Sequence, residues 1–96
     1  MSKDSIVCKV HADPGHRWYA VSSKVIRELD IVNEITHYSY VSNSGTTVYL
    51  EEDADARLFI SAAFDAGYNV TLKYAKESEK RSPIRNYRSY SAWGIK

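Results

Sequence analysis

The sequence predicts an α+β fold, with a mainly antiparallel sheet of about five strands and two helices on one face. Its 96 residues, 44% of them apolar, suffice for one small domain with a single core. Strand-like stretches come in pairs joined by turn residues, and each pair precedes a stretch with helical spacing. The resulting order, ββαββαβ, lacks the regular strand and helix alternation of a parallel sheet, which favours antiparallel pairing.

The first half of the chain predicts a hairpin followed by a short helix. Residues 5–12 alternate between apolar and polar side chains, as a half-buried strand does. Pro14 and Gly15 have the chemistry of a type II turn, and residues 16–21 form the second strand. Ser22 or Ser23 then caps a helix that ends near residues 30–33.

The second half repeats this element order with different residues. Residues 35–41 and 46–51 are rich in β-branched and aromatic side chains, and a Ser-Asn-Ser-Gly turn separates them, which predicts a second hairpin. A helix beginning at Asp53 and ending before Gly67 follows, and residues 69–75 form the last strand. The spacing of its apolar residues predicts that one helix face packs on the sheet through Ala56, Phe59, Ile60, Ala63 and Phe64.

Charge divides the chain into two parts. Residues 1–75 carry 7 basic and 10 acidic side chains, a net charge of −3, and are predicted to form the single α+β domain. Residues 76–96 carry 6 basic and 2 acidic side chains, a net charge of +4. Spaced aromatic residues without a clear period predict an irregular basic C-terminal arm, or an edge segment, packed on the same domain.

The composition also predicts where the protein works. Cys8 is the only cysteine, so no internal disulfide forms, and the first residues lack the apolar run of a signal peptide. Every apolar stretch is interrupted well before the roughly 20 residues that a membrane helix needs. We therefore expect a soluble protein of a reducing cytoplasm that makes no membrane contact.

The C-terminal segment carries the strongest binding signal. It interleaves guanidinium groups, which pair with phosphates or carboxylates, and aromatic rings, which are enriched among interface hot spots. The alternative is that the rings tie the chain end to the domain while the arginines remain solvated. The predicted partner-binding residues are Arg81, Arg85, Tyr87, Arg88, Tyr90 and Trp93.

Two further clusters are secondary candidates. Near the first turn, Asp13, His16 and Trp18 form either a binding edge or, as we favour, a hydrogen-bonded turn with the tryptophan in the core. The acidic run is predicted to supply helix capping by Asp53 rather than a metal site, because it lacks the spacing of a calcium loop. The same run is also compatible with an acidic patch that docks a basic surface, through Glu51, Glu52 and Asp55.

Stacking and catalysis are less well supported. Tyr38, Tyr40 and Tyr49 lie on neighbouring predicted strands, where cross-strand packing is favoured over a base-stacking platform because basic residues are scarce nearby. Cys8 is predicted to be a small core residue rather than a nucleophile. We find no zinc pattern, phosphate-binding glycine loop or nucleophile elbow, so no catalytic residue, metal or cofactor is predicted.

Four strings in the chain resemble a family of small phage and prophage proteins without an assigned activity. They are D-P-G-H-x-W at Asp13 to Trp18, Y-S-Y at 38–40, V-Y-L-E-E-D-x-D at Val48 to Asp55 and R-S-x-I-R-x-Y at Arg81 to Tyr87. The resemblance implies a phage accessory product that acts in the bacterial host cytoplasm by binding a host protein, such as a defence protein, and modulating or inhibiting it. The alternative is a small nucleic-acid-binding module that uses the C-terminal Arg and Tyr residues.

Overall fold

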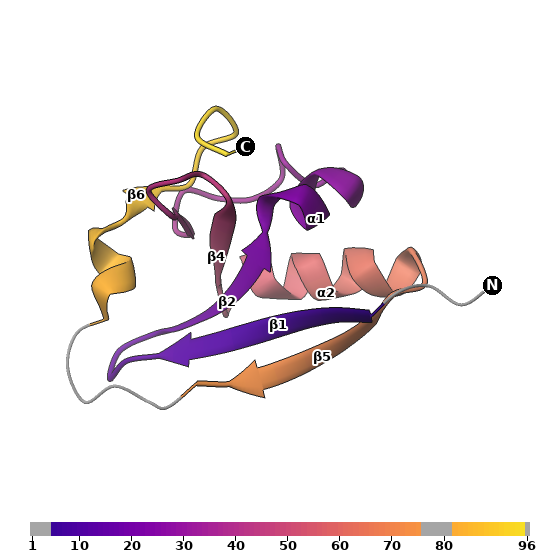
Figure 1. Ribbon diagram of the computed structural model, residues 1–96, viewed down its shortest axis with the longest axis horizontal. Coiled ribbons are helices and arrows are strands. Elements are labelled where there is room, and N and C mark those ends of the chain that lie inside the picture. The colour runs from indigo at the N-terminus through magenta and orange to yellow at the C-terminus, as the bar shows by residue number, and fades with distance from the viewer. Residues whose placement is uncertain (1–4, 76–81, 96) are drawn as a thin grey trace.

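The computed structural model describes residues 5–75 and 82–95, which form a mixed sheet with two helices (Figure 1). In this part of the chain the sheet has six strands in the order β5-β1-β2-β4-β3-β6. The strands are β1 (Ser5–Ala12), β2 (Arg17–Ser22), β3 (Tyr40–Val41), β4 (Thr47–Glu51), β5 (Asn69–Tyr74) and β6 (Arg88–Ser89). The helices are α1 (Ser23–Glu28) and α2 (Asp55–Asp65), with a 3₁₀ turn, η1 (Pro83–Asn86), between β5 and β6.

The α+β class and the predominance of antiparallel pairs are confirmed, but the predicted strand count and order need correction. β5 pairs with β1 in parallel, from Ser5 opposite Asn69 to Val10 opposite Tyr74, so the sheet is mixed. The reason is the crossover through α2, which returns the chain to the end of the sheet where β1 begins. The sixth strand, β6, lies in the predicted C-terminal arm and pairs with β3.

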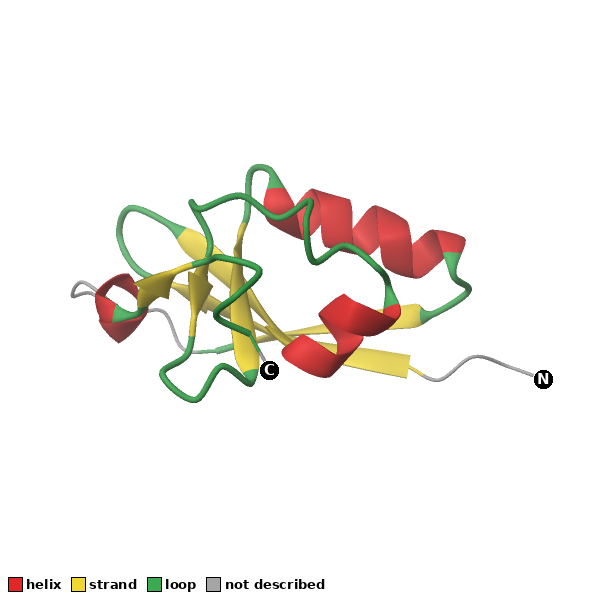
Figure 2. Cartoon of the chain, turned by 90° about the horizontal axis from the view of Figure 1, so that it is seen from above, coloured by secondary structure: helices red, strands yellow, loops and turns green. Residues whose placement is uncertain are grey.

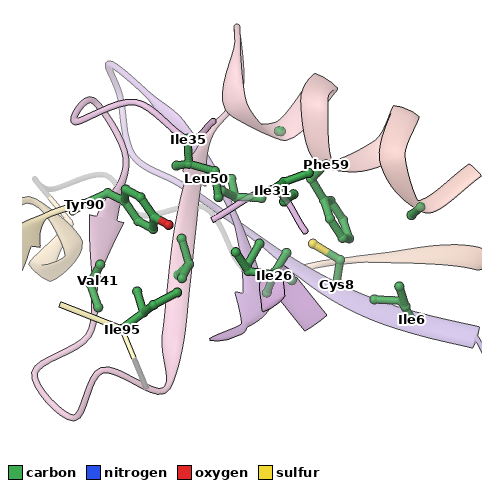
Figure 3. Close-up of a cluster of buried hydrophobic side chains, with 14 residues drawn as sticks. Ile6, Cys8, Ile26, Ile31, Ile35, Val41, Leu50, Phe59, Tyr90 and Ile95 are labelled. Carbon is green, nitrogen blue, oxygen red and sulfur yellow. The ribbon is translucent and has the colours of Figure 1, made fainter. Parts of the chain in front are cut away.

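One face of the sheet and both helices enclose the main core (Figure 3). Alternation along β1 directs Ile6 and Cys8 inward, where they share a cluster with Ile26 of α1 and Phe59 of α2. Cys8 is fully buried, as predicted for a core residue, and burial raises the pKa of its thiol to about 12. Because the thiolate is the reactive form of cysteine, a thiol that stays neutral contributes to packing only.

The first hairpin is confirmed, but its turn is not type II. Gly15 has no positive φ, whereas Asp13 Oδ1 accepts hydrogen bonds from the backbone N–H groups of Gly15 and His16 at 3.0 Å each. The turn is therefore shaped by the aspartate side chain. A Cβ at position 15 would lie 2.9 Å from Nη2 of Arg85, so a larger residue there would require the guanidinium to shift.

The predicted strand over 35–41 is wrong for most of its length, because only Tyr40–Val41 is extended. The preceding residues turn around the buried carboxylate of Asp55 in α2. That carboxylate accepts hydrogen bonds from the Thr36 hydroxyl at 2.7 Å and the Thr36 N–H at 3.1 Å, and also from the Ser39 hydroxyl. These bonds replace the pairing that a longer strand would make.

Helix α2 also departs from the prediction at two positions. Phe64 is 79% exposed, whereas Phe59 is fully buried. At 3.6 residues per turn, position 64 lies about 140° around the helix from position 59, outside the buried face. Asp53 does not cap the helix; instead the Glu51 carboxylate accepts hydrogen bonds from the N–H groups of Asp53 and Ala54, at 3.1 and 3.2 Å.

The C-terminal segment packs on the domain through buried Ile84, Tyr90 and Ile95. In Figure 2, η1 and β6 lie at the end of the sheet away from both helices. Cross-strand register places Trp18 on the face of the sheet opposite the main core, beside His11 on β1 and Glu51 on β4. Segment 82–90 reaches this face through Arg85, whose guanidinium lies over the Trp18 ring.

Candidate binding groove

An ion pair between Asp13 and Arg85 joins the first turn to η1. Arg85 donates to the Asp13 carboxylate from Nε at 2.6 Å and from Nη2 at 3.0 Å, and the Ser82 N–H donates to it at 2.9 Å. The Asp13 side chain is 1% exposed and that of Arg85 is 24% exposed. The Arg85 hydrogen bonds hold the pKa of the Asp13 carboxyl well below its usual range, although burial opposes this effect.

Arg85 also covers Trp18. The centre of its guanidinium lies 5.4 Å from the centroid of the Trp18 ring, within cation–π range. His16 stacks on the same indole at 5.9 Å, and Tyr40 meets it edge-on at 6.2 Å. Nη2 of Arg85 lies 2.8 Å from Nδ1 of His16, and because a guanidinium can only donate, Nδ1 is the acceptor in this contact.

Beside these four side chains lies a groove of about 480 Å³, which we call the Trp18 groove. It is assembled from the first turn, the loop before β3, the end of β4, η1 and β6. Its floor is aromatic and its rim carries both carboxylates and hydrogen-bond donors. The lining residues are His16, Trp18, His37, Tyr38, Tyr40, Glu51, Asp53, Arg85 and Ser89.

The outer rim of the Trp18 groove is formed by His37 and Tyr38. Both side chains are exposed, Tyr38 to 66%, and their rings lie 4.4 Å apart. The bonds from Thr36 and Ser39 to buried Asp55 fix the backbone on either side of them. A large aromatic side chain is thus presented to solvent from a loop that is itself well anchored.

The structure brings four of the predicted candidates together in this groove, namely His16, Trp18, Glu51 and Arg85. The groove also contains three lining residues that were not predicted from the sequence to bind a partner. They are His37, Asp53 and Ser89. The sequence marked Asp53 only as a helix cap, and no signal marked His37 or Ser89, because the three come from a loop, a helix start and a short edge strand that meet only in the folded chain.

Three other candidates have structural roles. Tyr90 is buried and its hydroxyl donates to the carbonyl oxygen of Val32. Asp55 is buried beneath the loop before β3. Tyr87 packs against Tyr49 with the ring centroids 5.4 Å apart. These contacts leave the two tyrosine rings and the Asp55 carboxylate engaged within the domain.

The remaining candidates lie outside the Trp18 groove. Glu52 pairs with Arg17 at 3.3 Å on the surface. Arg88 is exposed and reaches carbonyl oxygens of Ser42 and Gly94 at 3.5 and 3.4 Å. Trp93 is 98% exposed. Arg81 lies outside the described residues.

No protein-family model matches the chain, and no curated protein or solved structure matches it either. Among residues 5–75 and 82–95, no helix is long and apolar enough to cross a membrane. In the same part of the chain, no group of three or more His, Cys, Asp or Glu side chains is placed to hold a metal ion.

Proposed function

We propose that the protein is a phage-type accessory protein that binds a host protein in the bacterial cytoplasm and modulates or inhibits it by occupying its surface. In this proposal the Trp18 groove is the contact site, and the protein acts without catalysis. The observation that carries the proposal is the convergence of the four strings that resemble phage proteins. Every residue that lines the groove lies in one of them, except His37 and Ser89.

The chemistry of the groove supports a protein partner. Exposed Tyr38 supplies a large planar surface at small entropic cost, which is the property that makes tyrosine common at binding sites. The loop bonds to Asp55 hold the backbone that carries this ring, which lowers the cost of ordering the loop on binding. The carboxylates of Glu51 and Asp53 make the same groove unfavourable for phosphate groups.

A site-specific photocrosslinker at position 38 tests this proposal. The chain carrying it is expressed in bacterial cells, and a second chain carries the crosslinker in place of Phe64, an exposed aromatic residue on the outer face of α2. We expect a discrete adduct from position 38 and none from position 64. Binding of the identified partner is then measured for Tyr38→Ala and Phe64→Ala, with a loss of at least tenfold expected only for the first. Equal affinities would contradict the proposal.

The alternative function is nucleic-acid binding through the C-terminal Arg and Tyr residues. Exposed Arg88 and Trp93 are the described candidates that remain available for it. A gel-shift series with single- and double-stranded oligonucleotides at two salt concentrations tests it, because phosphate neutralisation releases counterions and makes binding steeply salt-dependent. Binding that weakens with salt and disappears in Arg88→Ala would favour this alternative over the protein-binding proposal.

A further inference from the structure

We infer that the Trp18 groove receives a cationic side chain, arginine or lysine, from a basic segment of the protein partner. This inference rests on the proposed function and names the chemistry of the ligand. The groove already holds one cation of its own, the guanidinium of Arg85, between the Trp18 ring and the Asp13 carboxylate. This internal arrangement combines an aromatic face with a carboxylate, the two groups that favour a guanidinium.

The open side of the groove offers the same combination of groups. Tyr38 and His37 present rings at the rim, and exposed Asp53 presents a carboxylate beside them. The Glu51 carboxylate lies next to it and adds negative charge, while its two oxygens accept from the N–H groups of Asp53 and Ala54. Within the described residues, no lysine or arginine forms an ion pair with either carboxylate. Asp53 is also exposed, so an incoming cation loses little of its hydration before it reaches the site.

The positive groups of the groove do not cancel the negative charge of the Glu51 and Asp53 carboxylates. The charge of Arg85 is balanced by Asp13, which lies behind it with both oxygens engaged. Nδ1 of His16 is already engaged, because it accepts from Arg85. The carboxylates of Glu51 and Asp53 therefore leave the groove with a net negative charge that complements a basic segment.

The size of the groove fits one long side chain with its adjoining backbone. A volume of about 480 Å³ lies within the range of small-ligand sites. An arginine side chain would lay its guanidinium against Tyr38 and direct its N–H groups to the carboxylates, while its methylene groups pack on Tyr40. Ser89 and His16 remain as hydrogen-bonding partners for the peptide backbone.

Backbone-amide NMR titration of the full chain with short peptides tests the inference. The probes are acetyl-Gly-Arg-Gly-amide, the same peptide with uncharged citrulline in place of arginine, and acetyl-Gly-Asp-Gly-amide. We expect saturable shifts at the amides of Tyr38, Tyr40 and Asp53 with the arginine peptide, and binding at least about fivefold weaker with citrulline. Equal binding of the arginine and citrulline peptides, or stronger binding of the aspartate peptide, would overturn it.

Two matched variants locate the effect. Asp53→Asn removes an exposed carboxylate at the groove, and Asp65→Asn removes an exposed carboxylate at the other end of α2. We expect about fivefold weaker binding of the arginine peptide for Asp53→Asn and unchanged binding for Asp65→Asn. Equal effects of the two variants would point to general charge attraction and would contradict a groove site.

The outcomes also separate this inference from the proposed function. If Tyr38→Ala weakens binding of the partner but the arginine and citrulline peptides bind equally, the ligand chemistry is wrong and the proposed function stands. If the arginine peptide binds selectively but Tyr38→Ala leaves partner binding unchanged, the groove recognises cations and the proposed function is wrong.

Discussion

Asp13 and Arg85 show how one residue pair connects distant parts of the chain. The carboxylate of Asp13 accepts from the guanidinium and from three backbone N–H groups, those of Gly15, His16 and Ser82. With 1% of the Asp13 side chain exposed, these groups and not water satisfy the carboxylate, so the loss of one is costly. Arg85 therefore belongs to the fold as well as to the groove, whereas the sequence predicted a partner-binding residue, with a solvated arginine as the alternative.

Replacing Arg85 with alanine should be strongly destabilising. The substitution leaves a buried carboxylate without its cation, and the free energy of unfolding should fall by about 3 kcal/mol in urea denaturation. Arg88→Ala is the control, because Arg88 is exposed and its two contacts are long. That variant should change the free energy of unfolding by no more than about 0.5 kcal/mol. Similar values for both variants would contradict the structural role of Arg85.

Acid should weaken the fold through Asp13. Its pKa in the folded protein is lower than in the unfolded chain, so its contribution is complete above the ordinary carboxyl pKa of about 4 and is lost as the pH falls below it. Urea denaturation from neutral pH to about pH 2 should show a steeper loss of stability for the wild type than for Asp13→Asn, which has no proton to take up at this position. Parallel curves would show that other carboxylates dominate the acid response.

At the scale of elements, α2 is positioned by one aromatic side chain and one carboxylate. Phe59 is buried in the main core, and Phe64 is directed to solvent. Phe59→Ala should therefore lower the free energy of unfolding by about 3–5 kcal/mol, whereas Phe64→Ala should change it by less than about 1 kcal/mol. Chemical denaturation of the two variants checks this assignment, and a reversed order would mean that the helix is rotated relative to the described face.

Asp55 links α2 to the loop that carries Tyr38. Asp55→Ala removes the acceptor for Thr36 and Ser39. The loop before β3 should then open locally, while the strands of the sheet remain paired. We expect faster hydrogen–deuterium exchange at residues 36–39, with little change in β1 and β2. Glu52→Ala, which removes only a surface pair with Arg17, is the control and should leave exchange in this loop unchanged.

At the scale of the whole molecule, the C-terminal segment completes the domain. It supplies β6, buries Ile84 and covers Trp18, which is almost fully buried, while Trp93 is exposed. A chain ending at Ala75 should show Trp18 fluorescence shifted to longer wavelength and a lower unfolding midpoint than the full chain carrying Trp93→Phe, because the indole becomes accessible to water. An unchanged emission maximum would show that Trp18 is buried without this segment.

The sequence by itself determined the elements whose signals are local. Alternation identified β1 and β5, and turn residues and strand-forming composition identified β2 and β4. Helical spacing identified α1 and α2, and Cys8 was assigned to the core, because each of these patterns depends on residues that are neighbours in the chain. The class of fold followed from their order. These observations required no knowledge of which segments meet in space.

Only the tertiary structure decided the features that depend on distant residues. A buried carboxylate in α2 converted most of the predicted strand at 35–41 into a loop, and the crossover through α2 made β5 parallel to β1. The sequence did not predict the ion pair of Arg85 with Asp13, because the two residues are 72 positions apart in the chain. The Trp18 groove is assembled from four separated stretches of the chain, and no local pattern predicts such an assembly, because buried polar groups take whichever partners the packed chain brings within reach.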